Sequence, residues 1–422
     1  MTTLDTVVVG AGHAGLAVSR LLTDAGRDHV VLDRGRVGER WRTERWDSLH
    51  LLTPAWMTRL PGGGYTGPDP DGYLSSGQFV GLLERYASSF GAPVVSGATV
   101  LSVTAGDSTA RRYRIVTTAG TWHARHVVVA TGPHGTPNVP EGVAGAEVLT
   151  SHRYRNPDRL APGGVLVVGA SASGLQIADE LNRSGRDVTL AVGRHTRVPR
   201  RYRGMDLFWW LDVTGRLART IDEVPDPAAA RRETSLQLVG RNDPDRAAPD
   251  LDLAGLHARG VRLTGRLASV TGGRARFGSE LTATVAAADR AMDRLLDSFD
   301  RFVERTGLAG EVWSQPRPRP VEVPAGPAEL DLRAEGIGTV LLATGYRPDH
   351  SWLRLPVLDA DGSIRQRRGA TPAEGLYVVG QRFQHRRDSG YIDGARHDAR
   401  AVVEHLHAGS SRHRPSVAEP AA

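Results

Sequence analysis

Short apolar runs alternate along the chain with longer stretches of helical periodicity, a pattern typical of a parallel sheet covered by helices. The first apolar run, residues 6–9, passes through a glycine-rich turn into the helical stretch 16–25. A second run follows at residues 30–32. The opening of the chain therefore predicts a strand, a tight turn, a helix and a second parallel strand.

The same pattern returns in the middle of the chain. The apolar run 165–168 leads through another glycine-rich turn into the helical stretch 175–183, and the run 188–192 follows. Two copies of one strand-turn-helix unit arise by chance far less often than one copy. We therefore predict an α/β fold with two Rossmann-like dinucleotide-binding domains.

The segments between and after these units complete the predicted fold. Residues 94–103, 113–118 and 122–130 resemble antiparallel strands, which would add a second β layer and give a three-layer β/β/α architecture. A long amphipathic helix is predicted at 283–305, with Met292 and its aromatic neighbours facing a core. Further buried strands are predicted at 339–343 and 376–380, before a helix at 395–407.

This order of elements predicts that one domain is inserted into the other. We expect a first domain made of residues 1–155 and 331–408, and an inserted domain at 156–330. The Pro-rich stretch 314–329 is expected to be a linker, and residues 409–422 a disordered tail.

Each glycine of the first turn has a mechanical reason. Gly10 permits the sharp turn, Gly12 lets the backbone approach a pyrophosphate, and Gly15 lets the helix pack close to the sheet. Asp33 follows the second strand, where an acid accepts a hydrogen bond from a ribose hydroxyl. Thr131 and Gly132 end a later strand, where small residues let the backbone lie against a cofactor.

The second turn carries Gly169, Ser171 and Gly174 at the corresponding places. The next strand ends near Arg194 where the first unit has an acid, and an arginine favours the 2′-phosphate of NADPH. Three further basic residues would support this role, and the alternative is a solvated basic edge. These three are Arg197, Arg200 and Arg201.

Composition narrows the chemistry. Cys is absent, which excludes disulfides, thiolate nucleophiles and Cys-ligated metals. Lys is absent as well, so all 53 basic residues are Arg and no Schiff-base lysine exists. The net charge of +6 comes from Arg scattered among Asp and Glu, which favours anionic cofactors over nucleic acid. No signal peptide and no apolar run long enough to span a membrane are evident, so we expect a cytoplasmic protein.

Together these motifs resemble the flavin-containing monooxygenases, which are two-dinucleotide-binding-domain flavoproteins. The segments that carry the resemblance are GAGHAG, LDR, VGERW, LLTP, SHRYRNP, VLVVGASASG and ATGYRPD. The resemblance implies FAD in the first domain, NADPH in the second, and no metal. The implied FAD contacts are Gly10, Gly12, Gly15, Asp33, Arg34, Trp41, Thr131, Gly132 and Gly380, and the implied NADPH contacts are Gly169, Ser171, Gly174 and Arg194.

The chain departs from the family at several positions. Tyr154 and Arg155 match the end of the family's identifying sequence, but Ala144, Ala146 and Thr150 replace its Phe, Gly and His. The middle glycine of the second turn is Ser171, and Thr53-Pro54 stands where animal-type members carry an asparagine beside the flavin.

The resemblance also implies a reaction. NADPH reduces FAD, and a C4a-(hydro)peroxyflavin formed with O₂ passes one oxygen atom to N, S or a carbonyl of a small organic substrate. Thr53 and Gln78, with the helix-capping Ser76, are candidates for polar contacts near the ring, and Arg201 for the nicotinamide side; each could equally be a capping or surface residue.

Two other functions remain open at this point, as does a homodimer. One is an NADPH-dependent reductase that passes electrons on without oxygen insertion, although the missing Cys pair argues against a disulfide reductase. The other is a flavin-bearing module without catalysis. The Trp-rich segment 41–56 and the partial SHRYR motif favour the monooxygenase.

Overall fold

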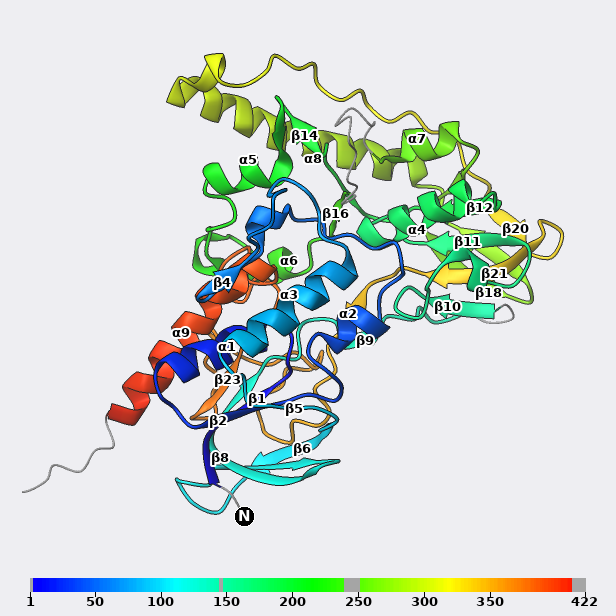
Figure 1. The fold of residues 1–422 in the computed structure, drawn as a ribbon. Helices are drawn as coiled ribbons and strands as arrows, with labels where there is room; N and C mark the ends of the chain where they lie inside the picture. Colours follow the sequence, from blue (N-terminus) through cyan, green and yellow to red (C-terminus); the bar gives the residue numbers. More distant parts are fainter. Residues whose placement is uncertain (1–2, 144–146, 239–250, 412–422) are drawn as a thin grey trace, which may run out of the picture.

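The computed structural model describes residues 3–143, 147–238 and 251–411, and it contains two units, each built on a parallel sheet (Figure 1). In the orientation of Figure 1 the first unit forms the lower part of the molecule and the second lies to the right. The predicted α/β class with two Rossmann-like units is confirmed.

The first sheet combines parallel and antiparallel strands. Its strands lie in the order β5 (Val94–Val95), β2 (His29–Leu32), β1 (Thr3–Val9), β8 (Gly120–Val129), β7 (Tyr113–Thr117) and β6 (Val100–Ala105), and β23 (Leu376–Val378) pairs with β8. Val8 faces the layer formed by α1 (His13–Asp24), α3 (Ser76–Ser89) and α9 (Ile392–Ser411). Val7 and Val9 face the antiparallel strands. Both faces of β1 are therefore buried, as a central parallel strand requires.

The second sheet repeats this arrangement. Its five parallel strands lie in the order β10 (Glu147–Thr150), β21 (Ile337–Leu342), β11 (Gly164–Val168), β12 (Val188–Ala191) and β17 (Arg262–Thr264). One face packs against α4 (Ala172–Arg183), α7 (Leu253–Ala258) and the start of α8 (Leu281–Thr306). The other packs against β18 (Leu267–Thr271), β19 (Arg274–Phe277) and β20 (Glu329–Asp331).

The expected domain boundaries at 155/156 and 330/331 are wrong. β10 lies before the first boundary and β21 after the second, yet both pair within the second sheet. The second unit therefore extends from residue 147 to residue 342. Apolar runs reveal that these strands exist but not which sheet they join. The chain passes between the units through β9 (Thr136–Pro137) and β22 (Tyr346–Arg347), which pair with each other.

The long helix α8 packs against an aromatic group from the second unit. The rings of Phe299 and Trp210 stack with their centroids 5.4 Å apart, and Met292 belongs to the same core, as predicted. Trp210 lies on α5 (Leu207–Val213), which follows the hairpin of β14 (Arg201–Tyr202) and β15 (Met205–Asp206). The Pro-rich stretch is not a free linker, because it returns along α8 (Figure 1) and the Val321 amide donates to Asp289 at 2.8 Å.

The remaining described elements are short. They are α2 (Glu39–Thr43), α6 (Pro227–Arg231), β3 (Arg59–Leu60), β4 (Gly63–Gly64), β13 (Thr196–Arg197), β16 (Leu236–Gln237), and the 3-10 turns Ala55–Met57, Pro157–Arg159, Ile221–Glu223 and Leu308–Gly310. The last helix continues to Ser411, past the expected start of the tail, and residues 412–422 lie outside the described part.

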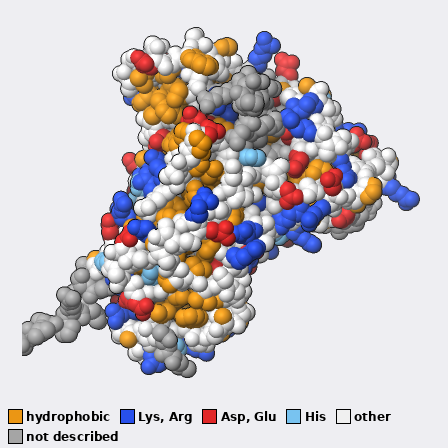
Figure 2. Space-filling view, in the orientation of Figure 1, with side chains coloured by type: hydrophobic (Ala, Val, Ile, Leu, Met, Phe, Trp, Pro, Cys, Tyr) orange, Lys and Arg blue, Asp and Glu red, His pale blue; other side chains and the backbone are white. Residues whose placement is uncertain are grey.

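The surface carries both signs of charge. Figure 2 shows Arg side chains interspersed with Asp and Glu over the face in view, the distribution that the sequence predicts. Within the described ranges, none of the helices combines the length and apolar character needed to span a bilayer.

Candidate functional site

The first glycine turn presses α1 against the sheet and leaves its N-terminus open. Gly10 has a φ of +112°, and a Cβ there would lie 2.6 Å from the carbonyl oxygen of Ala130. A Cβ on Gly15 would lie 1.9 Å from the oxygen of Gly10. Around Gly12 none of the described atoms lies within 4 Å of such a Cβ, and no side chain caps the helix there. Free N–H groups at a helix N-terminus that face open space form an anion site.

The second turn has the same geometry. Gly169 has a φ of +107°, and its Cβ would lie 2.6 Å from the oxygen of Ala343; that of Gly174 would lie 1.7 Å from the oxygen of Gly169. Ser171 is the N-cap residue of α4, yet its hydroxyl makes no capping hydrogen bond within the described chain. The change from Gly to Ser therefore leaves the helix N-terminus available to a ligand.

Three strand ends meet at the first turn. The Ala130 amide donates to Val9 at 2.8 Å and the Val379 amide donates to Val129 at 2.9 Å, so β1, β8 and β23 end at one edge. A Cβ on Gly380 would lie 2.9 Å from that of Ala14 in the first turn of α1. The structure thus brings the glycine turn, Thr131, Gly132 and Gly380 together.

Asp33 has a structural task in addition to the expected one. Its carboxylate accepts from the amides of Ala11 at 2.6 Å and Gly35 at 2.9 Å, which holds the glycine turn against the end of β2. Arg34 is exposed and pairs with Glu44. A ribose contact of Asp33 stays a prediction.

The tryptophans of the Trp-rich segment 41–56 have packing partners within the protein. Trp41 lies edge-on to Phe79, with ring centroids 5.0 Å apart, and the Arg45 guanidinium lies over its other side at 5.2 Å. Trp46 is buried in the core of the second unit, and Trp56 packs against the α8 cluster. Of these three tryptophans, Trp41 alone packs between α2 and α3 of the first unit.

The basic residues after β12 have different surroundings. Arg194 is exposed and donates to the carbonyl of Arg232 at 3.2 Å. Arg197 and Arg200 do not support it as expected, because carboxylates bind both: Arg197 pairs with Asp252 and the buried Asp289, and Arg200 pairs with Asp206. The structure adds Arg266, which lies against Gly193. Its sequence context contains no signal that it reaches this strand end.

Two of the three catalytic candidates lie on segments that touch. The Arg200 guanidinium donates to the carbonyl of Leu52 at 2.7 Å, so the residue before Arg201 contacts the residue before Thr53. Thr53 is 8% exposed, and within the described chain neither its hydroxyl nor the Arg201 guanidinium has a hydrogen-bond partner. Both groups are available to a ligand at the junction of the two units.

Gln78 has a different role from the expected one. Ser75, not Ser76, is the N-cap of α3, and the Gln78 side chain completes a capping box with it. The Gln78 oxygen accepts from the Ser75 amide at 2.9 Å, and the residue is exposed. The capping box thus engages the side-chain oxygen of the glutamine that we expected near the ring.

His13 was overlooked in the sequence although it lies inside the glycine turn. Its Nε2 is buried and lacks a hydrogen-bond partner within the described chain, and burial lowers the pKa of His13 to about 4. The imidazole is therefore neutral at neutral pH. Unpaired buried polar atoms are rare, so this one is a candidate for a ligand-related role.

The partial family motif around Tyr154 joins the two units. The buried Tyr154 hydroxyl donates to Glu180 at 2.8 Å, and burial raises its pKa far above the usual value. The Arg155 carbonyl accepts from Asp47 at 2.8 Å. Of the positions where the motif departs from the family, Ala144 and Ala146 lie outside the described residues.

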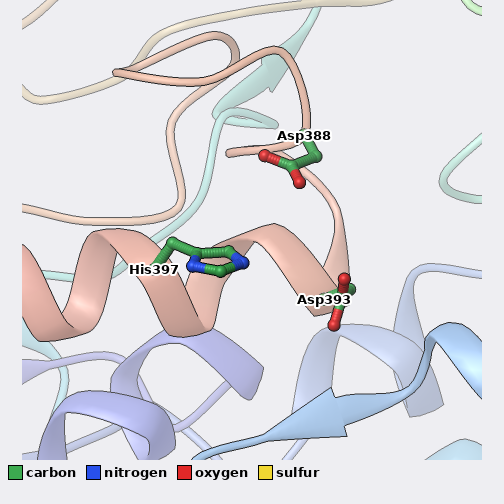
Figure 3. Close-up of side chains that lie close together, drawn as sticks. All are labelled: Asp388, Asp393 and His397. Carbon is green, nitrogen blue, oxygen red and sulfur yellow. The ribbon is translucent and has the colours of Figure 1, made fainter. Parts of the chain in front are cut away.

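A group with metal-ligating side chains lies at the start of α9. Potential ligand atoms of Asp388, Asp393 and His397 all lie within 4.8 Å of one another (Figure 3). However, Arg59 donates to both oxygens of Asp393 at 2.7 and 2.6 Å, and Arg386 binds Asp388 in the same way at 2.9 Å. Because guanidinium groups neutralise both carboxylates, we interpret the cluster as an ion-pair network that anchors α9.

Proteins of known sequence are similar to this chain, over all or part of its length. A family model described as pyridine nucleotide-disulphide oxidoreductase matches residues 7–204. An uncharacterized CzcO-like oxidoreductase of Geobacillus kaustophilus is 31% identical over 414 residues, which cover 96% of this chain and 98% of that protein. The indole-3-pyruvate monooxygenase YUCCA4 of Oryza sativa is 33% identical over 234 residues, covering 49% of this chain and 53% of that protein.

Solved structures share the fold. A flavin-containing monooxygenase from Stenotrophomonas maltophilia matches with a TM-score of 0.65 at 20% identity, over 97% of this chain and all of that chain. A bacillithiol disulfide reductase from Staphylococcus aureus matches with a TM-score of 0.59 at 13% identity, over 98% of this chain and all of that chain. The match along almost the whole of both chains to the CzcO-like protein shows that this chain belongs to the CzcO-like oxidoreductases.

Proposed function

We propose that the first unit binds FAD and the second binds NADPH. The duplicated glycine turn is the observation that carries this proposal, because each turn ends in an uncapped helix N-terminus. The residues present fit such ligands: a Cβ on Gly12 would meet open space, and the Ser171 hydroxyl makes no cap. Arg194, with Arg266 beside it, would bind the 2′-phosphate of NADPH.

We further propose that the enzyme is a monooxygenase that inserts one oxygen atom from O₂ into a small organic substrate. FAD, when bound, supplies the chemistry of hydride acceptance and oxygen activation. The similarity to YUCCA4, which is named an indole-3-pyruvate monooxygenase, supports oxygen insertion. This similarity covers about half of the chain.

In this proposal the chain's own residues bind, orient and exclude water. Thr53 and Arg201 would offer a hydroxyl and a cation at the junction of the units, where the Arg200–Leu52 hydrogen bond holds their segments together. The Arg200 guanidinium also lies over the Tyr73 ring at 4.3 Å, and the Tyr73 hydroxyl donates to Asp206 at 2.7 Å. This network fixes the hairpin that carries Arg201, which is the preorganisation that a catalytic site requires.

A second candidate is a reductase that uses the same two ligands without oxygen insertion. This second candidate is supported by the fold that the chain shares with a bacillithiol disulfide reductase. The full sequence contains no Cys, so a dithiol relay within the chain is excluded. An electron acceptor would have to be another small molecule or a protein.

One stopped-flow experiment distinguishes the two candidates. The purified protein is reduced with NADPH without oxygen and then mixed with oxygenated buffer while the flavin spectrum is followed. A monooxygenase gives a persistent spectrum that differs from those of oxidised and reduced flavin. Immediate return of the oxidised spectrum with one equivalent of peroxide contradicts oxygen insertion, and lack of reduction by NADPH contradicts both candidates.

A further inference from the structure

Arg382 is a cation without a counter-ion two residues after Gly380. Its guanidinium has no hydrogen-bond or ion-pair partner within the described chain, and the residue is exposed. Surrounding protein and the nearby Arg387 lower the pKa of Arg382, although Tyr391 and Glu233 act in the opposite direction. Glu233 is already bound by Arg387. An excess of positive charge is thus maintained here at a cost in free energy.

The positive charge extends beyond one residue. Burial and the cations Arg387, Arg219 and Arg301 lower the pKa of Arg216. Burial, together with the cations Arg45, Arg40 and Arg382, also lowers the pKa of His134, in the loop after β8, to about 3. Arg382, in the loop that precedes α9, therefore lies close to the loop that follows β8. A positive potential of this kind attracts small anions.

The loop that carries Arg382 is held rigidly. Phe383, the next residue, has a φ of +45°, which is strained for a bulky side chain. The Ile221 amide donates to the His385 carbonyl at 2.7 Å, and the Arg387 amide donates to Arg219 at 2.9 Å. The backbone from which the Arg382 side chain extends is therefore held by hydrogen bonds from the second unit.

The two nucleotides do not need this cation. Their diphosphates have the helix N-termini at Gly12 and Ser171, and a 2′-phosphate has Arg194. Near Arg382 the surroundings are partly aromatic: a Cβ on Gly390, the residue before Tyr391, would lie 3.5 Å from the Arg382 Cα, and Tyr391 packs edge-on against the buried Phe208 with ring centroids 5.7 Å apart. A guanidinium beside aromatic side chains suits the carboxylate of an organic acid, because the planar fork matches the carboxylate oxygens.

We propose that Arg382 binds the carboxylate of an organic-acid substrate at the edge of the flavin site. This inference rests on the proposed function, since it names the class of molecule that would be oxygenated. Arg382 would be a specificity-determining residue: it would orient the acid group and leave the rest of the substrate toward the junction of the units.

The test compares two probes that differ in one group. Phenylpyruvate carries a carboxylate and a carbonyl, whereas phenylacetone keeps the carbonyl and the ring but is neutral. Binding of each, and of NADPH, is measured by calorimetry on the purified protein, its Arg382→Gln variant and an Arg354→Gln control. Arg354 is also exposed, but it lies on a distant loop whose backbone pairs with Val103.

We expect Arg382→Gln to weaken the binding of phenylpyruvate by about ten-fold or more. The affinities for phenylacetone and NADPH should stay within about two-fold of those of wild type. The Arg354→Gln variant should bind all three as wild type does. No binding of phenylpyruvate to wild type, or equal loss of both probes, overturns the proposal. A selective loss of NADPH would overturn it as well, by assigning Arg382 to the nucleotide. If flavin is held and reduced by NADPH while the acid fails to bind, only this inference falls.

Discussion

A Cβ on Gly15 would lie 1.9 Å from the carbonyl oxygen of Gly10, whereas a Cβ on Gly12 would meet none of the described atoms within 4 Å. The two glycines of one turn therefore have different tasks. Gly15 is needed for the close packing of α1 on the sheet, and Gly12 for space in front of the helix.

This difference gives a prediction for two alanine variants. Gly12→Ala should fold with a melting temperature near that of wild type but bind FAD at least about ten-fold more weakly, because the methyl group occupies the place of the phosphate. Gly15→Ala should lose stability outright, by several kcal/mol, because the methyl group collides with backbone. Thermal unfolding and FAD titration check both. Equal melting temperatures for the two variants would contradict the division of tasks.

The buried His13 predicts that FAD binding takes up a proton. Burial lowers the pKa of His13 to about 4 in the free protein, and a diphosphate at the adjacent helix N-terminus would raise it again. Between that pKa and the ordinary value near 6.5, the complex would then hold more protons than its separated components. Calorimetry near pH 5.5, in two buffers of different ionisation enthalpy, should show a difference that the His13→Gln variant lacks. Identical heats in both buffers for wild type would show that His13 does not titrate with binding.

The buried Asp398 predicts that the folded protein becomes less stable as the pH rises. The side chain is 1% exposed, and burial, reinforced by Asp388, raises the pKa of Asp398 to about 7. The unfolded chain releases this proton near pH 4, so the free energy of unfolding falls as pH rises from about 4 to 7 and then levels off, a loss on the order of 4 kcal/mol.

Asp398→Asn should remove that loss. We expect the variant to be more stable than wild type at pH 8, by an amount that shrinks by roughly 2 to 3 kcal/mol at pH 5. Urea unfolding at the two pH values measures this. A stability difference that does not change with pH would mean that Asp398 is ionised in the folded protein.

Arg194 predicts a preference between the two nicotinamide nucleotides. The exposed Arg194 follows β12, where it would bind the 2′-phosphate that NADH lacks. Arg194→Ala should therefore weaken the binding of NADPH by about ten-fold or more and that of NADH by less than about two-fold. Arg266→Ala should act in the same direction but less, because Arg266 flanks the strand end at Gly193. Binding is measured by fluorescence quenching. Equal effects on both nucleotides would remove Arg194 as the phosphate-binding residue.

The sequence predicts those parts of the molecule that depend on local pattern. Short apolar runs and glycine turns located β1, α1, β11 and α4, and helical spacing located α8 and its buried Met292. The glycine sites were predictable because each depends on backbone close to it in the chain.

Contacts between distant residues could not be predicted in the same way. Arg197 and Arg194 look alike in sequence, but Asp252 and Asp289 bury and neutralise only Arg197. Gln78 was placed near a ligand because its partner Ser75 lies outside the assumed helix boundary. The free charge of Arg382 becomes visible only when its neighbours are known to be bound elsewhere.

The position of β21 between β10 and β11 has a consequence for synthesis on the ribosome. Residues 164–168 emerge well before residues 337–342, which must insert beside them to complete the sheet. During that interval the edge of β11 stays open to other strands, and such late, long-range pairing is slow. Nascent chains that end before residue 337 should therefore be targets for chaperones, and both nucleotide sites form only near the completion of translation.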